Sequence, residues 1–184
     1  MKISADALLK SLPETQLLSM IDSNNSCKGL LTGYISEQIL LNKFLEIPGI
    51  TSVTKIPDHS PEKGDLLVEY RGRVFSVEVK CLYSNTEKET WLEGGVSGRV
   101  SIDMSDTKKL GNGKRTSSPL IGEFDVLAIC TVTITGTWDY YFIHNKHLPI
   151  SRKYPGRLKG SFRINTENTP CLYPDILQVI SDIS

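Results

Sequence analysis

The sequence predicts an α/β (α+β) protein in which helices flank a mixed central β-sheet. Three patterns indicate this class: helical spacing of apolar residues over 30–45, strand-like apolar runs over 50–80, and two later strand-like runs before a C-terminal helical segment. The chain has 184 residues, of which 39% are apolar and 23% charged. That length and composition are typical of one globular domain, which we expect to cover residues 1–184.

The N-terminal quarter is expected to be helical. Apolar residues at helical spacing predict a helix over roughly 4–22, interrupted at Pro13, and polar residues over 24–29 predict a loop. A stronger helical pattern runs over 30–45 and ends before Pro48.

The rest of the chain is expected to be rich in strands. Predicted strands cover 50–56, 65–70, 74–80, 124–133 and 138–143. The remaining expectations are loops over 84–100 and 111–119, a short helix over 101–110, a basic segment rich in Pro and Gly over 145–170, and a closing helix over 174–183.

Two of these strands form a predicted hairpin around Arg71-Gly72. If these two residues are the turn, Tyr70 pairs with Arg73, and the same register places Asp65 opposite Glu78. Side chains alternate between the two faces of a strand, so Asp65, Glu78 and Lys80 share one face while the apolar residues share the other. A turn one residue longer or shorter would abolish this pairing.

Two opposed carboxylates about 5 Å apart repel one another, so a positive charge is expected between them. A divalent cation with oxygen ligands fits this position, and Lys80 supplies part of the charge. Beside two carboxylates Lys80 is expected to stay protonated. The alternative is an edge hairpin with a surface Glu-Lys pattern, although the apolar residues around Glu78 favour a buried strand.

Glu37 is a further candidate on the helix over 30–45. On a helical wheel it falls within an apolar stripe, whose other members are Leu30, Tyr34, Leu41, Phe44 and Leu45. Burying an isolated carboxylate is costly, so Glu37 should be paired, protonated or linked to a metal. The alternative is a glutamate at the exposed edge of the stripe.

Together these residues resemble the PD-(D/E)XK nuclease superfamily over residues 33–81. Asp65, twelve intervening residues and then Glu78-Val79-Lys80 are similar to its motif, with Gly64 in place of the motif's proline, and Glu37 is similar to its helical acid. The resemblance implies a restriction-endonuclease-like core. It also implies a Mg²⁺ site, which Mn²⁺ could also occupy, formed by Asp65, Glu78 and the Val79 carbonyl. In that site Lys80 would orient water or stabilise developing charge, and Glu37 would hold a second ion or a water.

Charge is divided unevenly, although the net charge is zero. Residues 1–93 contain 10 basic and 13 acidic side chains, whereas residues 94–166 contain 11 basic and 5 acidic ones. This asymmetry indicates an acidic half that does chemistry and a basic half that meets a polyanion, and the alternative is a solvated basic loop. With the resemblance, we expect a core motif region over 30–81 and a variable, basic, DNA-contacting region over 82–166. The candidate DNA contacts are Lys108, Lys109, Lys114, Arg115, Arg152, Lys153, Arg157, Lys159 and Arg163.

The predicted activity is a Mg²⁺-dependent endodeoxyribonuclease, most simply a type II restriction-like homodimer that cuts duplex DNA. Holliday-junction resolvases and homing or repair nucleases share the motif spacing and remain alternatives. A non-catalytic DNA- or protein-binding module is disfavoured by the complete trio of Asp65, Glu78 and Lys80. A hydrolase of small phosphoesters is disfavoured by the basic half of the chain.

The sequence contains neither a signal peptide nor a run long enough to span a membrane, so we expect a cytoplasmic protein. The four cysteines, Cys27, Cys81, Cys130 and Cys171, lack the close pairing of zinc ligands and are expected to be reduced thiols.

Overall fold

The computed structural model describes residues 4, 7, 9–58, 60, 62–83, 91–92, 95–103, 108–109 and 115–181. The chain divides into two compact units, residues 1–35 and residues 36–184. Among the described residues, no helix combines the length and the apolar character that crossing a bilayer requires.

The first unit is helical. Helix α2 (Glu14–Ser23) begins directly after Pro13, which agrees with the predicted break. Helix α3 (Asn25–Leu45) begins one residue after Asn24, whose side-chain oxygen accepts a hydrogen bond of 2.9 Å from the Cys27 amide. This N-cap allows the helix to begin at Asn25, so the loop predicted over 24–29 is wrong.

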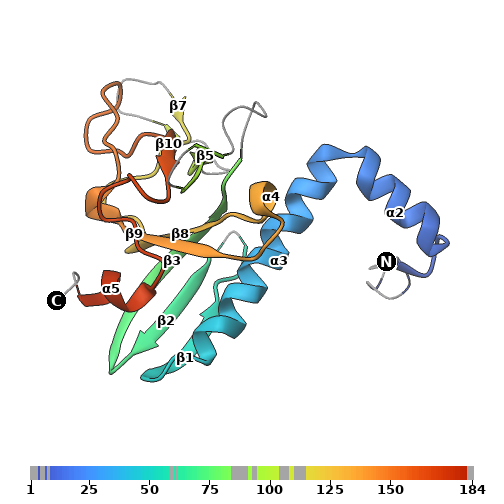
Figure 1. Ribbon diagram of the computed structural model, residues 1–184, viewed down its shortest axis with the longest axis horizontal. Helices are drawn as coiled ribbons and strands as arrows, with labels where there is room; N and C mark the ends of the chain where they lie inside the picture. The colour runs from blue at the N-terminus through green and yellow to red at the C-terminus, as the bar shows by residue number, and fades with distance from the viewer. Residues whose placement is uncertain are drawn as a thin grey trace. The chain divides into compact units, whose positions relative to one another are not determined.

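The second unit contains a mixed five-stranded sheet in the order β1-β2-β3-β8-β9 (Figure 1). Its strands are β1 (Ile50–Lys55), β2 (Leu66–Tyr70), β3 (Arg73–Cys81), β8 (Val126–Cys130) and β9 (Tyr140–His144). Strands β3 and β8 are parallel, whereas the other neighbours are antiparallel. The predicted class, a mixed sheet flanked by helices, is therefore confirmed.

Each face of this sheet has its own apolar core. On one face the core includes Leu66, Val68 and Val77 together with Leu40 and Phe44 of α3, and it also includes residues of α5 (Ile176–Ser181). On the other face, Leu127 and Ile129 of β8 pack with residues of a second sheet in the order β10-β5-β4. The central sheet is therefore the middle of three layers.

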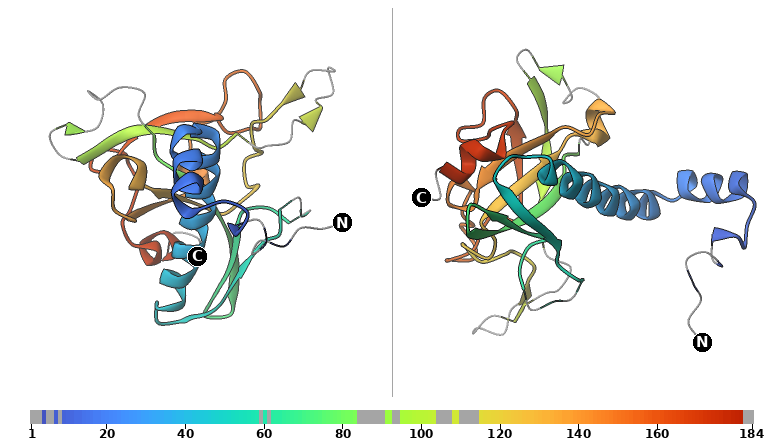
Figure 2. Two further views of the ribbon diagram at one scale, coloured as in Figure 1. Left: turned by 90° about the vertical axis from the view of Figure 1, so that its right-hand side faces the viewer. Right: turned by 90° about the horizontal axis from the view of Figure 1, so that it is seen from below.

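The second sheet was not predicted. It consists of β4 (Trp91–Leu92), β5 (Gly95–Ser101) and β10 (Ser161–Asn165), and β5 and β10 lie side by side in Figure 2. The loop predicted over 84–100 is therefore wrong for residues 91–92 and 95–100, and its other residues lie outside the described ones. The glycines of this segment suggested a loop, but Gly98 serves close packing, since a Cβ there would lie 2.8 Å from the Leu82 side chain.

Smaller elements complete the chain. They are β6 (Lys108–Lys109), β7 (Arg115–Thr116), α4 (Val132–Thr135) and the 3₁₀ turn η2 (Asn145–His147). The helix predicted over 101–110 is wrong for its described residues, because Ser101 ends β5 and residues 108–109 form a strand that pairs with β7. The strand predicted over 124–133 ends at Cys130, since α4 follows.

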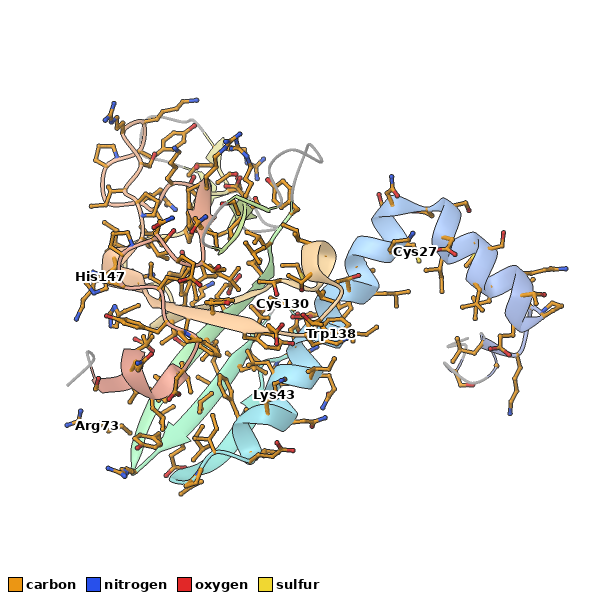
Figure 3. The ribbon with its side chains drawn as sticks, in the orientation of Figure 1. Cys27, Lys43, Arg73, Cys130, Trp138 and His147 are labelled. Carbon is orange, nitrogen blue, oxygen red and sulfur yellow. The ribbon has the colours of Figure 1, made fainter. Side chains whose placement is uncertain are left out.

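The cysteines are free thiols, as predicted. Cys81 and Cys130 are register partners on the parallel strands β3 and β8, and Cys130 is labelled in Figure 3.

Candidate functional site

The hairpin of β2 and β3 has the predicted register. Its pairs run from Tyr70 with Arg73 to Leu66 with Val77, and Arg71 and Gly72 form the turn with positive φ angles of 50° and 76°. Leu66 and Val77 are buried in the core on the α3 face. Side-chain alternation therefore directs Glu78 and Lys80 toward the face covered by the second sheet.

Asp65 lies one residue before β2 and is fixed by its backbone. Its amide donates a hydrogen bond of 2.8 Å to the Val77 carbonyl, and its carbonyl accepts one of 2.9 Å from the Ile56 amide. Its carboxylate oxygen Oδ2 accepts a third bond of 2.7 Å from the Val79 amide. Because the N–H and C=O of one strand residue point to the same edge, the Val79 carbonyl also points toward Asp65.

Gly64, which precedes Asp65, is required by the local backbone conformation. Its φ angle is +91°, which a proline ring cannot adopt, and a Cβ at this position would lie 3.1 Å from the Val77 carbonyl oxygen. The turn that leads into Asp65 therefore requires glycine.

Lys80 joins the two carboxylates. Its Nζ lies 2.6 Å from Glu78 Oε1 and 3.7 Å from Asp65 Oδ2. Burial alone would lower the pKa of Lys80, but the negative charges of Glu78 and Asp65 outweigh burial and raise that pKa above its ordinary value. The pKa of Glu78 is raised, chiefly because burial penalises its charged form. Lys80 is therefore held as an ammonium at neutral pH, which agrees with the expectation from the sequence.

Glu37 lies close enough to Asp65 and Lys80 for their charges to affect its pKa. Its side chain is 14% exposed and forms an ion pair of 2.6 Å with Lys55. Burial raises its pKa, and the charge of Asp65 raises it further while Lys55 and Lys80 lower it. The predicted stripe around Glu37 is partly wrong, because Leu30, Tyr34 and Leu45 are exposed and the buried residues of α3 are Ser36, Leu40 and Phe44.

The sequence reasoning missed Lys55, the partner of Glu37. Lys55 is the last residue of β1 and is the register partner of Leu66, the residue after Asp65. Extending the hairpin register to the preceding strand would have placed Lys55 at the same end of the sheet as Asp65.

Lys63 and Glu123 were also missed. They form an ion pair of 3.7 Å and, with Glu78, line a cavity of about 20 Å³ beside the site. No spacing rule connects Glu123 to the hairpin, because it lies in the loop before β8.

The donor set fits a hard divalent cation. The structure brings together the carboxylates of Asp65 and Glu78 with the Val79 carbonyl, all oxygen donors, at a point where an ammonium is already held. Among the described residues, no group of three or more His, Cys, Asp or Glu side chains is placed to hold a metal ion. A cation at this site would therefore depend on the two carboxylates, the Val79 carbonyl, and substrate or water.

The candidate DNA contacts lie in several places. Arg115, Arg152, Lys153, Lys159 and Arg163 are exposed on β7, on β10 and in the segment before β10. Lys108 and Lys109 form β6, and Lys114 lies outside the described residues. The exposed Arg163 pairs in register with Arg99 of β5, in the layer toward which Glu78 and Lys80 point.

Arg157 requires a correction. Only 8% of it is exposed, and its guanidinium donates a hydrogen bond of 2.6 Å to the Ser118 carbonyl. A buried and hydrogen-bonded guanidinium stabilises the fold and is not available to a phosphate. Its basic neighbours in the sequence suggested a contact with DNA, but the strand bridge between Leu120 and Arg157 turns it inward.

No protein-family model matches the chain, and no curated protein matches its sequence. Solved structures that are similar to it include a bacterial homing endonuclease and MepB. The bacterial homing endonuclease I-Ssp6803I is 18% identical over 76% of this chain and 78% of that chain, with a TM-score of 0.45. MepB is 15% identical over 70% of this chain and 78% of that chain, with a TM-score of 0.34. Identities and TM-scores this low do not show a shared function, so the chemistry of this chain is inferred from its own side chains.

Proposed function

We propose that this chain is a Mg²⁺-dependent endodeoxyribonuclease of the PD-(D/E)XK type that hydrolyses phosphodiester bonds in duplex DNA as a restriction-like homodimer. The observation that supports this most directly is the position of Lys80, whose ammonium lies 2.6 Å from Glu78 and 3.7 Å from Asp65 on one hairpin. Two carboxylates and a protonated lysine at one point match the needs of phosphodiester hydrolysis.

Each residue has a role that follows from its contacts. Asp65 and Glu78, with the Val79 carbonyl, would hold the cation, and Mg²⁺ bound there would supply an activated water and neutralise charge on the scissile phosphate. Lys80 keeps its proton and stabilises the negative charge that develops on the phosphate oxygens. The Val79 amide fixes the Asp65 carboxylate at 2.7 Å, so that this ligand is oriented before substrate arrives.

Glu37 and Lys55 form the outer part of the site. Their ion pair of 2.6 Å favours the charged form of the mostly buried Glu37 carboxylate, which would hold a second ion or a water. The exposed basic side chains, Arg163 among them, would supply salt-sensitive contacts to the DNA backbone.

The experiment is cleavage of supercoiled plasmid and of a panel of linear duplexes, with Mg²⁺ or with EDTA. Lys80→Ala and Asp65→Asn should each reduce cleavage at least about 100-fold, the usual cost of removing a charged group that stabilises the transition state. Lys43→Ala is the matched control, since Lys43 is an exposed lysine on α3 (labelled in Figure 3). Its Nζ lies 6.0 Å from the centroid of the Tyr140 ring.

Discrete fragments that require Mg²⁺ and disappear in both site variants would support the proposal. Cutting of branched substrates alone would instead indicate a junction-resolving enzyme. If no DNA is cut by a folded protein, or if Lys80→Ala cuts as fast as Lys43→Ala, the trio is structural and a binding module becomes the better reading.

A further inference from the structure

The first unit presents an apolar surface with no core of its own. None of the described residues within 1–35 is buried, and α2 has no buried residue along its whole length. Within α2 and residues 25–35 of α3, six large apolar side chains are between 38% and 61% exposed: Leu18, Met20, Leu30, Leu31, Tyr34 and Ile35. Scattered apolar residues are normal on a protein surface, but a group of this size marks an interaction site.

These residues follow helical spacing. In α3, Leu30, Leu31, Tyr34 and Ile35 recur at intervals of one and three, which places them on one side of the helix. In α2, Leu18 and Met20 fall on the same half of the helix as Leu17 and Ile21. An isolated ten-residue helix is only marginally stable in water. A packing partner would therefore stabilise α2 as well as cover the apolar surface.

We propose that the partner is the same surface on a second copy of this chain, so that the helical arm of residues 1–35 is the self-association element. A fully exposed large apolar residue has roughly 200 Å² of accessible surface, so the exposed fractions of these six residues sum to on the order of 600 Å² per copy. Two copies then bury about 1,200 Å², the lower end of the range for specific, stable interfaces. A two-fold arrangement lets one patch serve both partners.

The charges of the arm favour a second copy over a polyanion. Residues 1–35 contain three lysines, Lys2, Lys10 and Lys28, and three acids, Asp6, Glu14 and Asp22. Lys28 and Asp22 form an ion pair of 3.0 Å within the arm. The arm therefore has no net charge that would oppose pairing with itself. It also lacks the surplus of basic residues that DNA or an anionic membrane requires.

This inference rests on the homodimer of the proposed function and names the surface that forms it. Its test requires neither DNA nor Mg²⁺, so a failure of self-association is distinguishable from a failure of the proposed nuclease activity. Sedimentation of the full chain from 1 to 100 µM should show a monomer–dimer equilibrium. Leu30→Glu, at the most exposed of the six residues, should weaken self-association at least tenfold. Asn25→Glu adds the same charge at an exposed polar residue about 140° around α3 from Leu30, and it should leave self-association unchanged.

Unchanged circular dichroism and an unchanged urea midpoint would establish that both variants are folded. The proposal is overturned if the wild-type chain is monomeric at 100 µM, or if Leu30→Glu associates as tightly as Asn25→Glu. A monomeric chain that sediments with vesicles containing phosphatidylserine would also overturn it, because the apolar surface would then be a membrane contact.

Discussion

Replacing Lys80 by methionine keeps the length of the side chain and removes the ammonium that lies between Glu78 and Asp65. At distances of 2.6 and 3.7 Å, each attraction amounts to about 4–6 kcal/mol at an effective dielectric constant of about 20. Desolvation of the three charges offsets most of this, and solvent screens the rest because 28% of the Lys80 side chain is exposed. We expect the variant to lose about 2–3 kcal/mol of unfolding free energy in EDTA.

Urea unfolding of four proteins measures this loss: the wild type, Lys80→Met, Glu78→Gln and the double variant. Because Glu78→Gln removes one of the opposed carboxylates, the double variant should lose less than the sum of the single losses, with a coupling of at least about 1 kcal/mol. Millimolar Mg²⁺ should restore at least half of the stability lost by Lys80→Met, since a cation with oxygen ligands replaces the missing charge.

Two results would refute this reasoning. Additive losses in the double variant would mean that Lys80 and Glu78 do not act on each other. If Mg²⁺ stabilised the wild type and Lys80→Met equally, the difference in unfolding free energy between them would remain. The cation would then not bind between these carboxylates.

Three further predictions concern the turn, the pH dependence and the basic segment. Gly64→Pro should destabilise the fold by about 3 kcal/mol or more, because φ is +91° there; a urea midpoint equal to that of wild type would contradict this. Because the pKa of Glu78 is higher in the folded state than in the unfolded state, protonation of Glu78 favours folding. The free energy of unfolding in EDTA should therefore fall as the pH rises from the unfolded-state pKa of a glutamate through the folded-state pKa of Glu78. Over the same interval, stabilisation by Mg²⁺ should increase, and Glu78→Gln should flatten both trends. Arg157→Ala should lower the urea midpoint through loss of its buried hydrogen bond, whereas Arg152→Ala, at an exposed position, should leave the midpoint unchanged and reduce the salt dependence of DNA binding.

The hairpin and its charged residues could be predicted from sequence because their contacts are local. Asp65 and Lys80 are 15 positions apart, and one two-residue turn determines which side chains face each other. The alternation of apolar residues then identifies the buried face. The same reasoning located α5 and most of the central sheet, where apolar runs are continuous.

The elements that were missed depend on contacts between distant residues. Strand β5 pairs with β10 some sixty positions later, and its glycines indicated a loop until that packing was known. The burial of Arg157 likewise follows from a bridge to Leu120 and not from its basic neighbours. The exposed N-terminal half of α3 has apolar spacing like that of its buried half, so periodicity alone did not separate them.

The parallel pairing of β3 with β8 requires a long connection between two adjacent strands, and here residues 82–125 provide it. The residues proposed to bind the cation all precede this connection, whereas β5 and the short strands β6 and β7 lie within it. Changes of length or sequence in the connection leave the hairpin contacts of Asp65, Glu78 and Lys80 intact, because those contacts are made within β2, β3 and the residue before β2. If the proposed function holds, changes in this connection would alter substrate contacts while the hairpin residues proposed to bind the cation stay the same.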